Sequence, residues 1–389
     1  MSKSVKSFII NQEIIVNRNF DFEEILMEQK ILIIGASGLV GTATALEFHS
    51  AGYEVVSVSR RVPELLSQDS IKHFSIDLQN RTACDEFINS QCLDVTHLVY
   101  TAVYELPGLI KGWTDKKQID TNGSMLENVL GPLSKTGKLR HVTLLQGTKA
   151  YGLTVGPIRT PARESQNRVV HPNFYWVQED FLRSQSKKKH FEYTIIRPQL
   201  IVGPNHGVVM NIPPVIGIYG AIKKELGFPF SFPGGPTWVW EAVDVRLVAQ
   251  AIRWATENSI ANGETYNLTN GEVFSFRDMW PRLAQVLGLE VGDDVPCMLS
   301  DYIPKNKNVW ETIVKKFGLR DIGLNNILGE SHFYADMCFA SGFDKAPPPT
   351  FVSSIKIKEH GFNQVWNTEE SFCYWLEDLQ KRKVLPIYN

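Results

Sequence analysis

The chain has 389 residues, of which 43% are hydrophobic and 11% aromatic, which is enough to bury a large core. Its 40 basic and 42 acidic residues leave a formal net charge of -2, so no global field favours nucleic acid or an anionic membrane, and we expect a small-molecule partner. Five scattered cysteines without metal-ligand spacing and the absence of a signal peptide predict a soluble, cytoplasmic protein with no metal site; a homodimer stays open.

The chain begins with a polar-interrupted stretch, residues 1–29, which we expect to be an N-terminal extension. A run at 30–35 follows that is apolar after Lys30 and ends in glycine, typical of a parallel strand buried on both faces. A helix over 41–51 and a strand over 54–59 complete a βαβ unit. Further strands are predicted at 97–100, 141–145 and 193–196, with helices between them. This alternation predicts an α/β fold, a Rossmann doubly wound parallel sheet.

A glycine-rich loop lies between the first strand and the first helix. Gly35-x-x-Gly38-x-x-Gly41 has the spacing and the setting of a dinucleotide-binding loop. Glycines let backbone N–H groups approach a pyrophosphate at the positive end of the helix dipole. We therefore predict that the cofactor phosphates contact Gly35, Ser37, Gly38, Leu39, Val40 and Gly41.

The end of the second strand predicts which cofactor is bound. NAD-binding enzymes usually have an acid here for the ribose hydroxyls, whereas this chain reads Ser59-Arg60-Arg61. Two guanidinium groups can hold an additional 2′-phosphate, which favours NADPH; as an alternative, they are solvated surface arginines. Asp77 and Leu78, after the predicted third strand, are suited to contact adenine.

The composition of the sequence changes after Pro204, where proline-rich segments predict loops. We predict an NADP-binding Rossmann domain over residues 30–210 and a smaller C-terminal substrate-binding lobe over 211–389. A helix predicted near 243–256 returns to the Rossmann domain.

The catalytic motif departs from the Tyr-x-x-x-Lys pattern that most short-chain dehydrogenases/reductases carry. The best candidate tyrosine is Tyr175, but Glu179 stands four residues later. A lysine, Lys149, instead follows the strand at 141–145, in the sequence Gly147-Thr148-Lys149.

With this displaced pair, the chain resembles the progesterone 5β-reductase and iridoid synthase-like (PRISE) family of atypical extended short-chain dehydrogenases/reductases, from about residue 30 to the C-terminus. Other carriers of the resemblance are Asn173-Phe174, Arg197-Pro198, Ile201-Val202-Gly203, Tyr266-Asn267, Asn270-Gly271, Met279-Trp280-Pro281, Ser354-Ile355-Lys356 and Gly361-Phe362. The resemblance implies Tyr175 and Lys149 as catalytic residues and an NADPH-dependent oxidoreductase that reduces activated carbon–carbon double bonds. Further cofactor contacts are expected from Thr101, Ala102, Gln146, Tyr175, Arg197, Pro198 and Ile201, and substrate contacts from Tyr104, Trp113 and Tyr151.

The implied mechanism is 1,4-reduction of an α,β-unsaturated carbonyl, in which Tyr175 and Lys149 stabilise the enolate oxygen. Neighbouring cations are expected to depress the pKa of Tyr175. Two alternatives stay open. The first is a carbonyl reductase or another extended short-chain dehydrogenase/reductase, since the same tyrosine can donate to an alkoxide. The second is a protein that senses NADP without catalysis.

Overall fold

The computed structural model describes residues 29–66, 71–107 and 111–388, so the predicted extension over 1–29 lies outside the described residues except for its last position. No helix in these three ranges is long and apolar enough to cross a membrane. The five cysteines are all free thiols, four of them buried.

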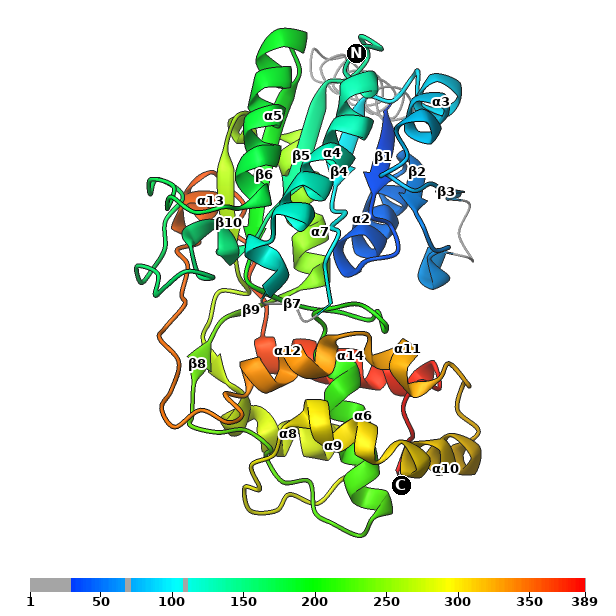
Figure 1. Cartoon of the computed structure of the whole chain (residues 1–389), viewed down its shortest axis with the longest axis vertical. Coiled ribbons are helices and arrows are strands. Elements are labelled where there is room, and N and C mark those ends of the chain that lie inside the picture. Colours follow the sequence, from blue (N-terminus) through cyan, green and yellow to red (C-terminus); the bar gives the residue numbers. More distant parts are fainter. Residues whose placement is uncertain (1–28, 67–70, 108–110, 389) are drawn as a thin grey trace, which may run out of the picture.

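A parallel sheet forms the centre of the larger half of the molecule (Figure 1). Its strand order is β10-β6-β5-β4-β1-β2-β3, in which the chain moves outward in both directions from β1. This order confirms the predicted doubly wound Rossmann fold. The strands are β1 (Lys30–Ile34), β2 (Glu54–Ser59), β3 (Lys72–Ser75), β4 (His97–Tyr100), β5 (His141–Leu145), β6 (Glu192–Pro198) and β10 (Thr265–Leu268).

Strand β1 shows why its run is continuously apolar. Ile31 and Ile33 belong to the apolar core on one face of the sheet, and Leu32 and Ile34 belong to the core on the other face. Since alternate side chains of a strand point to opposite faces, a strand covered on both sides must be apolar throughout. Helices α2 (Leu39–Ser50) and α7 (Val245–Glu257) cover the first face; α3 (Arg81–Gln91), α4 (Lys116–Leu133) and α5 (Phe174–Lys189) cover the second.

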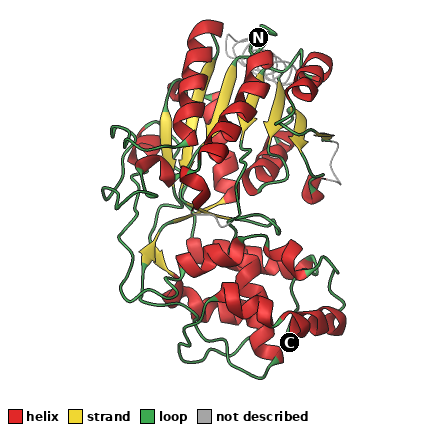
Figure 2. Cartoon of the chain, viewed as in Figure 1, coloured by secondary structure: helices red, strands yellow, loops and turns green. Residues whose placement is uncertain are grey.

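A mainly helical lobe lies beyond the carboxyl ends of the strands (Figure 2). Two short strand pairs, β7 (Leu200–Val202) with β9 (Ala242–Asp244) and β8 (Val239–Trp240) with β11 (Phe274–Ser275), lie near the junction. The lobe helices are α6 (Pro213–Glu225), α8 (Phe276–Leu287), α9 (Leu299–Lys305), α10 (Lys307–Phe317), α11 (Leu324–Leu328), α12 (Ser331–Cys338) and α14 (Thr368–Lys381).

The chain enters the lobe close to the predicted boundary at residue 210. Some later segments, however, return to the Rossmann half, so residues 211–389 do not all belong to the lobe. The predicted returning helix is α7, which packs against α2. Strand β10 also returns and pairs with β6 at the sheet edge, and α13 (Ile355–Glu359) packs against β10. The four residues of β10 carry no clear strand pattern, because their conformation depends on pairing with β6 far away in the sequence.

Candidate active site

A cleft of about 1050 Å³ lies where the carboxyl ends of the sheet strands face the lobe. One side, the strand-end wall, consists of residues that follow the parallel strands: Gly35, Ser37, Gly38, Leu39, Val40, Gly41, Ser59, Arg60, Arg61, Asp77, Leu78, Thr101, Ala102, Gln146, Gly147, Lys149, Pro198 and Ile201. The other side, the lobe wall, is mainly apolar and consists of Val208, Val209, Met210, Trp238, Trp240, Tyr334, Met337, Phe343, Pro347 and Pro348. Open α/β sheets bind their ligands at this edge.

The glycine-rich loop has no room for side chains at its two ends. Gly35 has a φ of +91°, which glycine tolerates best, and a β-carbon on Gly41 would lie 2.2 Å from the Gly35 carbonyl oxygen. Gly38 caps the N-terminus of α2 without a side-chain hydrogen bond. The first N–H groups of the helix therefore face the cleft with no side chain over them, as an anion site requires.

Arg60 and Arg61 are exposed and line the cleft at the end of β2. The Ser59 hydroxyl donates a hydrogen bond to the Arg61 carbonyl oxygen at 2.6 Å, which fixes the turn that carries them. Neither guanidinium has an ion-pair partner within the described part of the chain, so both are available to an anionic ligand.

Asn173 connects the two candidate catalytic residues. It caps α5, where its side-chain oxygen accepts a hydrogen bond from the Tyr175 N–H at 3.0 Å. Its side-chain nitrogen donates to the Lys149 carbonyl oxygen at 3.1 Å. A β-carbon on Gly147 would lie 3.4 Å from the Tyr175 hydroxyl oxygen, so this phenol lies directly against the turn that carries Lys149.

Trp113 packs against both Lys149 and Tyr175. The Lys149 ammonium lies 3.5 Å from the centre of the Trp113 ring and 3.6 Å from the Met210 sulfur. The Tyr175 and Trp113 rings meet edge to face with centres 5.5 Å apart. Lys149 is thus held by a cation–π contact rather than by a carboxylate, which leaves its positive charge available to the cleft.

The pKa of Tyr175 differs from what the sequence led us to expect. Burial raises the pKa of Tyr175, and the charge of Glu105 raises it further, whereas Arg197 lowers it only in part. The expected depression of the Tyr175 pKa is therefore wrong for this structure, because loss of solvation outweighs the neighbouring cations. Tyr175 stays a neutral phenol that can donate a hydrogen bond. Burial also lowers the pKa of Lys149 to about 8, with Glu105 opposing.

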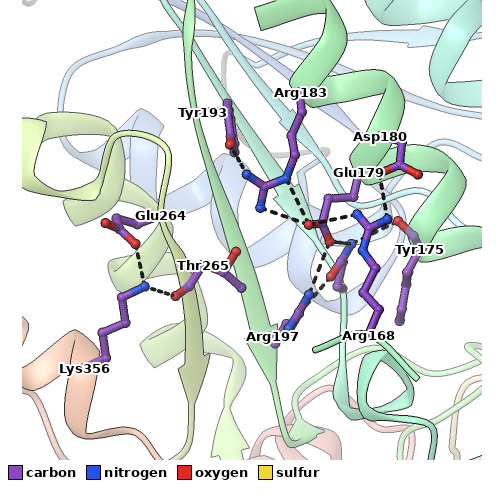
Figure 3. Close-up of polar contacts among 11 residues, drawn as sticks. Arg168, Tyr175, Glu179, Asp180, Arg183, Tyr193, Arg197, Glu264, Thr265 and Lys356 are labelled. Carbon is purple, nitrogen blue, oxygen red and sulfur yellow. Dashed lines mark hydrogen bonds and ion pairs between the residues drawn. The ribbon is translucent and has the colours of Figure 1, made fainter. Parts of the chain in front are cut away.

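Glu179, at the position of the usual lysine, is the centre of an arginine cluster (Figure 3). It forms ion pairs with Arg168 at 3.1 Å, Arg183 at 2.9 Å and Arg197 at 3.3 Å. Burial alone would raise the pKa of Glu179, but Arg197 and Arg168 hold it below its ordinary value. A lysine here would be surrounded by three cations. A lysine at position 179 would therefore be repelled by these guanidinium groups.

The predicted cofactor-binding residues line the cleft with one exception. Arg197 lies behind it, in the arginine cluster, and donates to the Gln146 side-chain oxygen at 2.9 Å. Among the predicted substrate contacts, Tyr104 and Trp113 line the cleft, but Tyr151 does not: its hydroxyl donates to Asn267 at 2.6 Å. Tyr151 is therefore placed as a packing residue.

Sequence reasoning missed Glu105, which lines the cleft near Tyr175 and Lys149, and most of the lobe wall. The adjacent Tyr104 was the only signal near Glu105. Tyr334 and Met337 carried no signal, because nothing in the sequence shows that α12 lies over the strand ends.

This fold and this cleft define a Rossmann-fold protein of the extended short-chain dehydrogenase/reductase type. A family model described as a PRISE-like Rossmann-fold domain matches residues 90–335, and the chain belongs to this family. It is 29% identical over 382 residues to an (S)-8-oxocitronellyl enol synthase of Nepeta cataria, covering 91% of each chain. It is also 29% identical over 386 residues to a 3-oxo-Delta(4,5)-steroid 5-beta-reductase of Arabidopsis thaliana, covering 92% of this chain and 94% of the relative.

Solved structures share the fold at much lower identity. A UDP-glucose 4-epimerase of Thermotoga maritima, crystallised with UDP-glucose, superposes with a TM-score of 0.63 at 15% identity over 91% of this chain and 99% of that chain. A short-chain dehydrogenase/reductase superfamily protein of Agrobacterium tumefaciens with bound NAD gives 0.60 at 14% identity, over 92% of this chain and 98% of that chain. These likenesses support the fold assignment.

Proposed function

We propose that this protein is an NADPH-dependent reductase of activated carbon–carbon double bonds, which reduces α,β-unsaturated carbonyl compounds. The observation that carries the proposal is the pairing of Tyr175 with Lys149 at the strand-end wall, held by Asn173, in a chain whose Glu179 excludes the usual lysine. The relatives named as an enol synthase and a steroid 5-beta-reductase support the same class of reaction.

The residues present fit a nicotinamide dinucleotide phosphate. The close approach of Gly41 to the Gly35 carbonyl leaves a side-chain-free surface at the start of α2 for the pyrophosphate. Arg60 and Arg61, with no carboxylate at the end of β2, suit the 2′-phosphate, and Asp77 with Leu78 suits adenine. When bound, this cofactor supplies the hydride for reduction of the double bond.

The protein side chains stabilise the negative charge that develops on the substrate oxygen. Tyr175, a neutral phenol, donates a hydrogen bond to the substrate carbonyl oxygen, which becomes an enolate oxygen as the β-carbon is reduced. Lys149 adds a positive potential at the same end of the cleft. The apolar lobe wall excludes water, so that both interactions act in a medium of low dielectric constant.

The test is product analysis with purified protein, NADPH and cyclohexenone. We expect cyclohexanone as the product. An allylic alcohol would support the alternative of direct carbonyl reduction, in which Tyr175 donates to an alkoxide. Tight NADP binding without turnover over a broad panel of enones would support the non-catalytic alternative.

A further inference from the structure

Glu105 is a half-buried acid, with buried carboxylate oxygens, that the proposed reaction does not use. It lies on the loop that follows β4, after Thr101 and Ala102 of the strand-end wall, and it lines the cleft. Neither of its carboxylate oxygens has accessible surface or a hydrogen-bond partner within the described ranges. Burial raises its pKa, while the charge of Lys149 and the nearby Trp113 N–H lower it. The Trp113 N–H likewise has no hydrogen-bond partner among the described residues.

Two other buried acids of this protein, Glu241 and Asp336, accept hydrogen bonds from backbone N–H groups. Glu241 accepts a hydrogen bond from the Val352 N–H at 2.8 Å. Asp336 accepts from the Leu299 N–H at 2.6 Å and from the Ser300 N–H at 3.0 Å. Native proteins rarely leave a buried polar group without a partner, because its lost hydration is then uncompensated. An orphaned carboxylate beside a ligand cleft therefore indicates a donor that arrives with the ligand, and the Glu105 side chain must turn toward the cleft to meet it, since its oxygens have no accessible surface in this structure.

The surroundings of Glu105 restrict what that donor is. Its charge influences Lys149 and Tyr175, which are both hydrogen-bond donors. These two suit a carbonyl oxygen, whereas an ionised carboxylate repels one and needs an O–H or N–H group. The Lys149 ammonium already supplies a positive charge nearby, so a second cation on the substrate would be repelled. A neutral hydroxyl group satisfies both conditions.

We propose that Glu105 is a specificity-determining residue that accepts a hydrogen bond from a hydroxyl group of the substrate, so that the preferred substrates are hydroxylated enones or enals. The proposal rests on the proposed function, because the substrate carbonyl is taken to face Tyr175 and Lys149. The cleft then presents two donors for the carbonyl oxygen and one acceptor for the hydroxyl. An apolar enone fills the same cleft but leaves Glu105 unpaired, and this penalty is the source of discrimination.

The experiment compares matched substrates that differ by one hydroxyl: cyclohexenone with γ-hydroxycyclohexenone, and a straight-chain enal with its γ-hydroxy derivative. We expect the full-length protein with saturating NADPH to favour the hydroxylated member of at least one pair by about tenfold or more in kcat/KM, the size of a hydrogen bond to a charged group. Glu105→Met should bring this ratio close to one. Glu105→Gln, whose amide oxygen still accepts, should keep part of it.

The matched control is Glu330→Gln. Glu330 raises the pKa of Glu105 through its charge but does not line the cleft, so the substrate ratio should survive its loss. Calorimetry of the NADP-loaded protein with cyclohexanone and its hydroxylated counterpart provides a second readout, which does not require turnover. The same preference for the hydroxylated ligand, lost in Glu105→Met, is expected there.

Equal kcat/KM within both pairs, or a ratio unchanged in Glu105→Met, would overturn the proposal. So would an equal loss on both members of a pair with a shifted pH profile, since Glu105 would then act through Lys149. Failure of the proposed function looks different: neither member of either pair is reduced, and calorimetry alone then decides whether Glu105 selects a hydroxyl.

Discussion

The two walls of the cleft are built in different ways. The strand-end wall consists of short segments that each follow a parallel strand, so the sheet brings Gly35, Arg60, Thr101 and Gln146 to one edge regardless of the loops between them. The lobe wall is assembled from separate helices and proline-rich loops, and its residues meet only through tertiary packing. The proposed function accordingly takes its chemistry and cofactor contacts from the wall that the sheet fixes, and much of its apolar substrate-facing surface from the wall that the sheet does not fix.

The largest expected effect tests the chemistry of the strand-end wall. Tyr175→Phe should lower turnover of cyclohexenone by about 10² or more, as expected for loss of one oxyanion donor, with NADPH affinity nearly unchanged. Steady-state kinetics and cofactor titration measure the two quantities. Near-normal turnover in the folded variant would contradict the catalytic role of Tyr175. The double variant with Lys149→Met should be little worse than the worse single variant, because both groups act on one developing charge.

The preference for NADPH over NADH tests whether the strand-end wall binds the 2′-phosphate, as the sequence predicts. Replacing both Arg60 and Arg61 with alanine should raise the KM for NADPH by about tenfold or more, since two charge-assisted contacts to the 2′-phosphate are lost. The KM for NADH should change far less, because NADH lacks that phosphate. Equal effects on the two cofactors would show that these arginines are only solvated surface residues.

The pH dependence of activity tests whether the reaction needs the positive charge of Lys149. Burial lowers the pKa of Lys149 to about 8, so the ammonium is charged below this pH and becomes neutral as the pH rises through it. Activity that depends on the charge should accordingly fall above about pH 8. Lys149→Met should be slower by about tenfold at neutral pH, as one electrostatic contribution is removed, and should lack this alkaline decline. A decline of equal size in Lys149→Met would assign it to another group.

The contrast between the walls also explains what the sequence could predict. Strands β1, β2, β4 and β5 were predicted within a residue of their bounds, because strands buried on both faces carry short, mainly apolar runs. Glu105 could not be predicted as a site residue. It stands out because its carboxylate lacks a hydrogen-bond partner, and the lack of a partner depends on the tertiary positions of Lys149 and Trp113. The expected pKa of Tyr175 was wrong for a related reason: the sequence shows the nearby charges but not the depth of burial.

The smallest expected effect is on stability, and it concerns an ion-pair cluster between the Rossmann half and the lobe. Glu64, on the Rossmann half after β2, binds Arg320 of the lobe through two hydrogen bonds at 2.5 and 2.9 Å, and His206 lies 3.1 Å away. The hydrogen bond and charge of Arg320 outweigh burial and hold the pKa of Glu64 at about 2. Because this carboxylate is 40% exposed, we expect the cluster to stabilise the fold by at most about 1 kcal/mol.

The sign of the pH dependence follows from the depressed pKa of Glu64. The stabilisation is fully present above the ordinary carboxyl pKa of about 4.5 and is lost as the pH falls toward 2. Glu64→Gln should therefore lower the Tm by about one or two degrees at neutral pH, with the difference from the native chain shrinking as the pH falls below about 4.5. Glu127→Gln, an exposed acid without an ion pair among the described residues, is the matched control and should leave the Tm unchanged. A difference that grows on acidification would mean that Glu64 does not stabilise the fold through its charge.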